Sequence, residues 1–125
     1  MKQIIHTDEA PEAIGPYSQA VIQNRVIYCS GQIALDPGTL QLVGKDVETQ
    51  VRQVMENIGR VLEAAGSDFS NVLKCSIYLT DMEDFTKVNE IYGEYFPSNP
   101  PARETVAVKS LPKNALVEIS CIAHG

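Results

Sequence analysis

The sequence predicts an α+β protein in which one sheet carries two helices on the same face. Residues 46–65 place apolar side chains at the three- and four-residue spacing of a helix, and residues 72–80 alternate as a strand does. The remaining segments complete the order β-β-β-α-β-α-β-β. In a chain of 125 residues this order is typical of one α+β layer, so we expect a single domain over residues 1–125.

Three strands are expected near the N-terminus, over residues 2–7, 17–23 and 26–30. Asn24-Arg25 suits a tight hairpin between the last two, because Asn tolerates left-handed backbone geometry. Two prolines and a glycine predict a loop over residues 8–16, and Gly31 is expected to end the third strand. Asp36-Pro37-Gly38-Thr39 predicts a type II turn, since it places Pro and Gly where that turn favours them.

Two helices and three further strands follow. The first helix is expected over residues 46–65, with Asp46 capping its start and Gly66 its end. Asp81 is expected to cap the second helix, which ends before Pro97. Its inward residues are expected to be Phe85, Val88, Ile91, Tyr92 and Tyr95. The strands are expected over residues 72–80, 103–108 and 115–121, with a turn over residues 111–114.

The alternation along the strands predicts what each sheet face carries. The face toward the helices is expected to hold Leu73, Cys75, Ile77, Leu79, Val106, Val108, Val117, Ile119 and Cys121. The other face is expected to hold Tyr78, Ala107, Leu116 and Ile122 beside polar groups, and no segment remains to cover it. Such a face indicates an interface between copies of the chain. In this register Arg103, Thr105, Glu118 and Ser120 share the uncovered face.

Arg103 is the leading candidate for a functional residue. It follows Pro100-Pro101-Ala102 at the start of a strand, and Glu118 lies within the next apolar strand. A guanidinium binds a carboxylate through two parallel hydrogen bonds, and a carboxylate among apolar residues is costly unless it is held or used. The pair predicts a small-molecule site that holds an anion and handles a proton or a water. The alternatives are a surface ion pair of Arg103 with Glu104 or another neighbour, and a solvated edge position for Glu118.

Three further positions are weaker candidates. Ser30-Gly31 ends an apolar strand, where glycine lets a ligand approach the backbone, although it can equally be a strand terminator. Tyr17 follows a Gly-Pro turn and could present its hydroxyl to a ligand or simply pack in the core or an interface. Asn89 lies among apolar residues of the second helix, where a solvated helix face is the alternative.

Composition disfavours several classes of function. The net charge of −6 and the scattered Lys and Arg disfavour nucleic acid and anionic membranes as partners. The three cysteines lack metal-like spacing, so we expect buried, reduced thiols and no metal site. Neither a signal peptide nor a membrane span is predicted, which makes the cytoplasm the expected location.

Taken as a set, the short motifs closely resemble the RidA (YjgF) family of reactive-intermediate deaminases. They are Ile14-Gly15-Pro16-Tyr17-Ser18-Gln19-Ala20, Ser30-Gly31-Gln32-Ile33, Gln50 with Asn57, Val88-Asn89 before Tyr92 and Phe96, Pro101-Ala102-Arg103, and Leu111-Pro112 followed by Val117-Glu118-Ile119. The resemblance implies a chorismate-mutase-like fold with one mixed sheet, and a homotrimer with sites between subunits. It also implies cofactor-independent hydrolysis of 2-aminoacrylate-type enamines and imines to 2-keto acids and ammonia.

Carried onto this chain, the resemblance assigns each candidate a role. Arg103 would bind the substrate carboxylate, with backbone groups of Gly31 and Thr105 completing the cradle. Glu118 would polarise the attacking water or pass a proton. Tyr17, contributed across the interface, would close a pocket shaped by Ser30 and Asn89.

Two departures from the family pattern bear on function. Thr105 stands where many members carry Cys, which removes any thiol chemistry there, and Ser120 replaces the second acid of a common Glu-Ile-Glu ending. Two other functions stay open at this point. One is a non-catalytic regulatory protein that binds a keto acid, and the other is an endoribonuclease or translation inhibitor.

Overall fold

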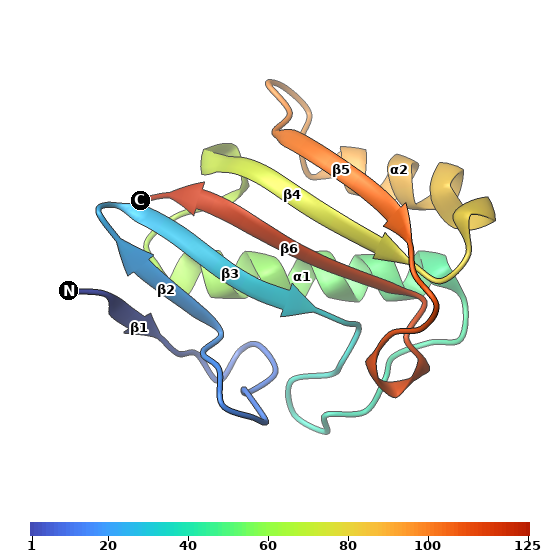
Figure 1. The fold of residues 1–125 in the computed structure, drawn as a ribbon, viewed down its shortest axis with the longest axis horizontal. Helices are drawn as coiled ribbons and strands as arrows, with labels where there is room; N and C mark the ends of the chain where they lie inside the picture. Colours follow the sequence, from blue (N-terminus) through green and yellow to red (C-terminus); the bar gives the residue numbers. More distant parts are fainter.

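The computed structural model describes residues 1–125 and contains a six-stranded sheet of order β1-β2-β3-β6-β4-β5 with two helices on one face (Figure 1). The strands are β1 (Gln3–Ile5), β2 (Ala20–Gln23), β3 (Val26–Gln32), β4 (Val72–Leu79), β5 (Ala102–Ala107) and β6 (Val117–His124). The helices are α1 (Val47–Ala64) and α2 (Phe85–Glu94), with short 3₁₀ turns at Phe69–Asn71, Met82–Asp84 and Pro112–Asn114. Only the β4–β5 pair is parallel, so the sheet is mixed and the predicted α+β class is confirmed.

The predictions of the first helix and of the hairpin at Asn24-Arg25 are confirmed. Asp46 caps α1 by accepting a hydrogen bond from the Thr49 amide at 2.8 Å, and Gly66 beyond its end has a φ of +77°. Asn24 and Arg25 both have positive φ, 52° and 67°, which is the backbone geometry of a tight hairpin between β2 and β3.

Three local predictions were wrong. Asp81 caps the 3₁₀ turn Met82–Asp84 by accepting a hydrogen bond from the Glu83 amide at 2.9 Å, whereas α2 has no side-chain cap. Gly31 does not end β3, which continues to Gln32 through an irregularity in its pairing with β6. The turn after Asp36 is not type II, because Gly38 does not have positive φ and Leu40 does, at 58°. Asp36 instead accepts hydrogen bonds through Oδ1 from the amides of Gly38 and Thr39, at 2.8 and 2.9 Å. The Asp36 side chain therefore stabilises this turn by itself, and the turn does not require positive φ at Gly38.

The core lies between the sheet and the helices. Its largest fully buried side chains include Ile27, Met55, Leu62, Ile77 and Ile119. The three cysteines are buried and free, as expected, and they lie in register on neighbouring strands: Cys29 opposite Cys121, and Cys121 opposite Cys75. Burial raises the pKa of the Cys75 thiol, which keeps it protonated and unreactive.

The face prediction for β5 was wrong. Arg103 pairs in register with Cys75 and Thr105 pairs with Ile77, and both partners are buried beneath the helices. Arg103 and Thr105 therefore face the helices, whereas Val106 pairs with Tyr78 and is 43% exposed on the other face. Since side chains alternate along a strand, an error of one residue in register exchanges the two faces.

Three other expected placements also differ. Ala107 pairs with the buried Leu79 and Leu116 packs against the core, so neither belongs to the uncovered face. Leu73 is 49% exposed because an irregularity between Val72 and Lys74 puts Val72 into the core in its place.

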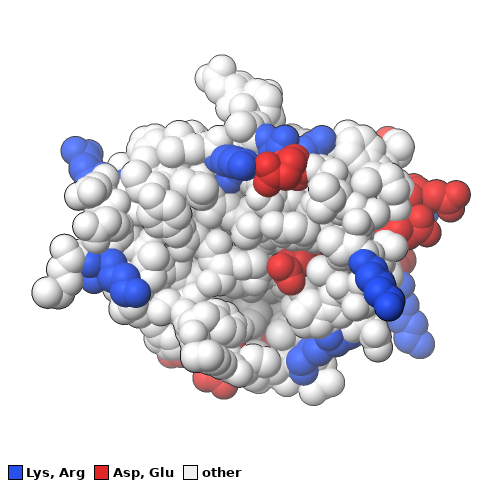
Figure 2. Space-filling model, viewed as in Figure 1, with Lys and Arg blue, Asp and Glu red and all other residues white.

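We call the sheet face opposite the helices the open face. It includes Tyr28, Ser76, Tyr78, Val106, Glu118, Ser120 and Ile122, together with the ion pair of Lys74 and Glu104. Figure 2 shows this face, and uncharged atoms cover most of it. Tyr28 is 48% exposed there. The prediction that one sheet face lacks cover within the chain is thus confirmed, with Tyr78 and Ile122 placed as expected.

Candidate functional site

A cavity of about 470 Å³ opens beside the end of β3. Its walls come from the loop before β2, the end of β3 and the segment after it, the turn before β6, and β6 itself. The lining residues are Pro11, Glu12, Ile14, Tyr17, Gln19, Ser30, Gly31, Gln32, Ile33, Leu35, Pro112, Lys113 and Glu118. Four of the residues singled out from the sequence meet here: Tyr17, Ser30, Gly31 and Glu118.

Glu118 and Gly31 are in close contact in this cavity. A Cβ atom built on Gly31 would lie 2.5 Å from Oε2 of Glu118 and 2.9 Å from its Cδ, closer than atoms can approach. Only glycine at position 31 leaves the carboxylate where it is. Partial burial raises the pKa of Glu118 above the ordinary glutamate value of 4.5. The carboxyl is therefore suited to exchange a proton at a less acidic pH than a solvated glutamate.

Tyr17 and Ser30 have different roles in the cavity wall. The Ser30 hydroxyl donates a 2.6 Å hydrogen bond to the Ser18 carbonyl, so it fixes the neighbouring segment to β3. Tyr17 is 52% exposed at the rim, just after a turn closed by its amide on the Gly15 carbonyl. Its ring is available to a ligand or to a second chain.

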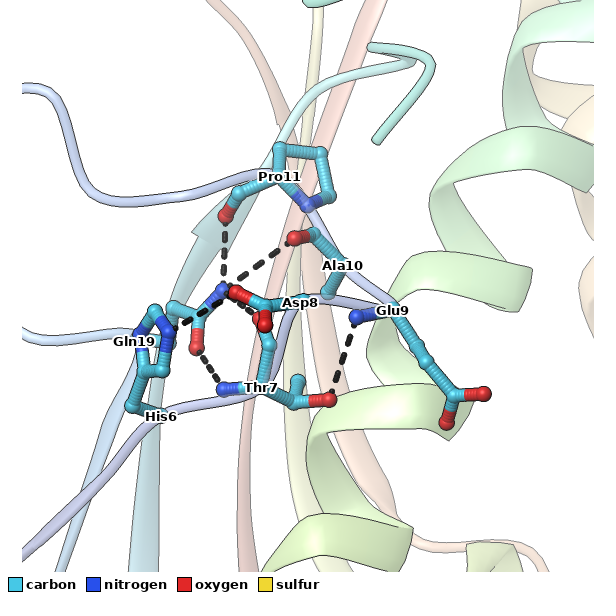
Figure 3. A network of polar contacts seen from close by, with 7 residues as sticks. All are labelled: His6, Thr7, Asp8, Glu9, Ala10, Pro11 and Gln19. Atoms are coloured by element: carbon cyan, nitrogen blue, oxygen red, sulfur yellow. Dashed lines mark hydrogen bonds and ion pairs between the residues drawn. The ribbon is translucent and has the colours of Figure 1, made fainter. Parts of the chain in front are cut away.

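Gln19 is a structural residue of this site that the sequence reasoning did not single out. Its side chain is buried, and Figure 3 shows it reaching the segment from Thr7 to Pro11. Oε1 accepts from the Thr7 amide at 2.7 Å, and Nε2 donates to the carbonyls of Thr7 (3.0 Å), Pro11 (2.8 Å) and Ala10 (3.3 Å). One amide thus fixes the loop that supplies Pro11 and Glu12 to the cavity.

A second group of candidates lies on the other side of the sheet, between β5 and α2. Arg103 donates from Nη1 to Oδ1 of Asn89 at 2.5 Å. Its guanidinium carbon lies 5.1 Å from the ring centre of Tyr92 and 5.6 Å from that of Phe85. Thr105 is on the same face of β5, and its hydroxyl oxygen is buried without a hydrogen-bond partner.

Arg103 makes no ion pair. Glu104, the partner considered for it, pairs with Lys74 at 3.0 Å and accepts a hydrogen bond from the Ser76 hydroxyl. Two other arginines do form ion pairs, Arg52 with Glu94 and Arg60 with Glu63. The surface ion-pair alternative for Arg103 is therefore wrong, and its guanidinium keeps donors free for an anion.

The expected placement of Arg103 and Glu118 on one face is wrong. Arg103, Thr105 and Asn89 lie on the helix side of β5, whereas Glu118 pairs with Tyr78 and points to the open face. Gly31 accompanies Glu118 and not Arg103. We call the first set the arginine half-site and the set of Tyr17, Ser30, Gly31 and Glu118 the glutamate half-site.

The structure contains no group of three or more His, Cys, Asp or Glu side chains arranged to hold a metal ion. None of its helices combines the length and the apolar character needed to span a membrane.

Comparison with known proteins places the chain in a family. The family model described as Endoribonuclease L-PSP matches residues 7–125. The chain belongs to this family, also known as RidA/YjgF. Human 2-iminobutanoate/2-iminopropanoate deaminase, a relative, is 50% identical over 123 residues, which cover 98% of this chain and 90% of the human protein.

Solved structures agree with this assignment. The Rid-family protein YyfA of Yersinia pestis superposes with a TM-score of 0.98 at 48% identity, over 100% of both chains. Escherichia coli TdcF with bound serine gives a TM-score of 0.94 at 37% identity, over 98% of both chains. The predicted membership of the RidA family is confirmed.

Proposed function

We propose that this RidA-family chain hydrolyses 2-imino acids and their enamine tautomers, of the 2-aminoacrylate type, to 2-keto acids and ammonia. The observation that carries the proposal is the half-buried guanidinium of Arg103, which has no carboxylate partner of its own. A small 2-imino acid supplies such a carboxylate. The name of the human relative, a 2-iminobutanoate/2-iminopropanoate deaminase, supports the same substrate class.

The active unit is proposed to be a homotrimer in which each site is shared by two copies. Two features support this. The arginine half-site and the glutamate half-site face opposite sides of the sheet in one chain, and the open face exposes apolar side chains such as Tyr28 and Val106. A threefold rotation that brings the arginine half-site of one copy against the glutamate half-site of the next gives a closed ring with three identical sites.

In the shared site, Arg103 of one copy binds the substrate carboxylate, and backbone groups of Thr105 and of the neighbour's Gly31 complete the cradle. Ionised Glu118 of the neighbouring copy accepts a proton from a water as the water oxygen bonds to the imine carbon, and it then passes that proton to the nitrogen. The resulting carbinolamine loses ammonia, and the carbon–nitrogen bond is replaced by the carbonyl of the keto acid. One water is consumed and one ammonia released for each imine.

The catalytic demand on the protein is modest. An imine is already electrophilic, so the residues need only orient it and place the water. A positioned base contributes about 10²–10⁴-fold. The carboxylate anchor adds effective concentration.

Keto-acid formation from freshly generated 2-aminoacrylate tests the proposal. We expect the wild-type protein to accelerate it and Arg103→Ala to lose about 10²-fold in kcat/KM, because the substrate carboxylate loses its partner. Arg60→Ala is the matched control, since it removes an exposed arginine paired only with Glu63. Equal rates for the wild-type protein and buffer alone would contradict the proposal.

Two other functions have less support than imine hydrolysis. A regulatory protein could use the same anion site without turnover, and calorimetry with a 2-keto acid alongside the rate assay separates the two. The family description names an endoribonuclease, but the net charge of −6 disfavours a phosphate backbone as ligand.

A further inference from the structure

The guanidinium of Arg103 is held entirely by uncharged groups. Phe85, Asn89 and Tyr92 contribute two ring faces and one amide oxygen, and all three come from α2. Their spacing of four and three residues puts them on one face of that helix. The side chains of Phe85 and Asn89 are half-buried and Tyr92 is buried, so this neutral cradle is part of the packed structure.

The neutrality of the cradle has a chemical consequence. A carboxylate next to Arg103 would occupy its fork of donors and compete with an anionic ligand. Ring faces instead attract the cation through the aromatic quadrupole and restrict its orientation. A ring accepts no conventional hydrogen bond, so the N–H donors that Asn89 does not occupy remain available.

We infer that Phe85 and Tyr92 are positioning residues, which together with the Asn89 amide orient the Arg103 guanidinium without neutralising it. The inference rests on the proposed role of Arg103 as the carboxylate anchor. It assigns to α2 a contribution to affinity that is separate from packing. The expected effects are on ligand binding and KM, while kcat stays nearly constant because the rings act through the carboxylate anchor and not on the water or its base.

Calorimetry with 2-oxobutanoate tests the inference directly and does not depend on turnover. Phe85→Leu is expected to weaken binding by about 5- to 20-fold, and Phe85→Tyr to retain it because the ring face remains. Tyr92→Phe is likewise expected to bind normally. Asn89→Asp is expected to weaken binding by about tenfold or more, although an aspartate can accept the same hydrogen bond, because its charge neutralises Arg103.

A purely structural role is distinguished in the Arg103→Ala background. If Phe85 acts through Arg103, Phe85→Leu adds no further loss there. Three outcomes would overturn the inference. Phe85→Leu could weaken binding equally in the wild-type and Arg103→Ala backgrounds, Phe85→Leu and Asn89→Asp could both bind as the wild type does, or the wild-type protein could fail to bind 2-oxobutanoate. If the variants change 2-oxobutanoate affinity as expected but the wild-type protein does not hydrolyse imines, the result counts against the proposed function alone. Intact hydrolysis with insensitive Phe85→Leu and Asn89→Asp variants counts against this inference alone.

Discussion

Glu118 and Gly31 depend on each other at the scale of single residues. The glycine leaves room for the carboxylate, and partial burial of the carboxylate raises its pKa. The same burial that makes the ionised form less stable also makes it a stronger base. The room that Gly31 leaves and the partial burial of the carboxylate together place an incompletely solvated base at the cavity.

The raised pKa of Glu118 predicts an acid limb in the pH profile. The proposed base is active when ionised, so kcat/KM should fall as pH drops through this pKa. The midpoint should lie above 4.5, the ordinary glutamate value. Glu118→Gln should lower kcat/KM by about 10²–10³-fold and remove that limb, because the amide does not titrate. An unchanged acid limb in the variant would assign the titration to another group.

Gly31→Ala should displace the carboxylate without unfolding the protein. The new Cβ would meet the end of the Glu118 side chain, which can rotate away. We expect a loss of about 10- to 100-fold in kcat/KM, since a misplaced catalytic group costs this much. Gly93→Ala is the control, because a Cβ there meets nothing within 4 Å and activity should be retained. Wild-type activity in Gly31→Ala would refute the importance of the contact.

At the scale of elements, sequence patterns predicted the features that depend on neighbouring residues, such as helix bounds and the order of strands and helices. The bounds of α1 follow from its apolar spacing and its caps, and the order of strands and helices was correct. The register of β5 was not predictable in the same way. It is an edge strand in which each face mixes polar and apolar residues: Arg103, Thr105 and Ala107 on the helix side, and Ala102, Glu104 and Val106 on the open face. Alternation alone cannot then choose a face.

The candidate site residues were singled out from the sequence, but their arrangement in the fold was not predicted. Motifs singled out the members of both half-sites, yet their separation depends on the β5 register. Gln19 was missed as a structural residue because a glutamine beside a strand looks like any polar surface residue. Only the fold brings its amide to the carbonyls of Thr7, Ala10 and Pro11.

Gln19→Ala should test how one side chain fixes the loop before β2. The change leaves the Thr7 amide and several carbonyls without their partner, and we expect about 2–4 kcal/mol lower stability in urea unfolding. KM should rise, because the loop supplies part of the cavity wall. Gln41→Ala, at an exposed position, should change neither. Equal stability of the two variants would show that the loop is held by other contacts.

At the scale of the whole molecule, one chain carries both half-sites but on opposite sides of its sheet. Within one copy Arg103 cannot complete the glutamate half-site if each side chain keeps its observed partners. The exposed apolar side chains of the open face, such as Tyr28 and Val106, favour association between copies of the chain. Association would therefore be a condition of activity and not only of stability.

Mixing two inactive variants gives the sharpest test of a shared site. Arg103→Ala keeps Glu118, and Glu118→Gln keeps Arg103. If the variants are dissociated, combined in equal amounts and reassembled, random mixing makes about three quarters of the trimers mixed, each with one intact site in three. About one quarter of wild-type activity should return, whereas each variant treated alone should stay inactive. No recovery in trimers shown by mass spectrometry to be mixed would mean that Arg103 and Glu118 act within the same copy, or that they do not act together at all.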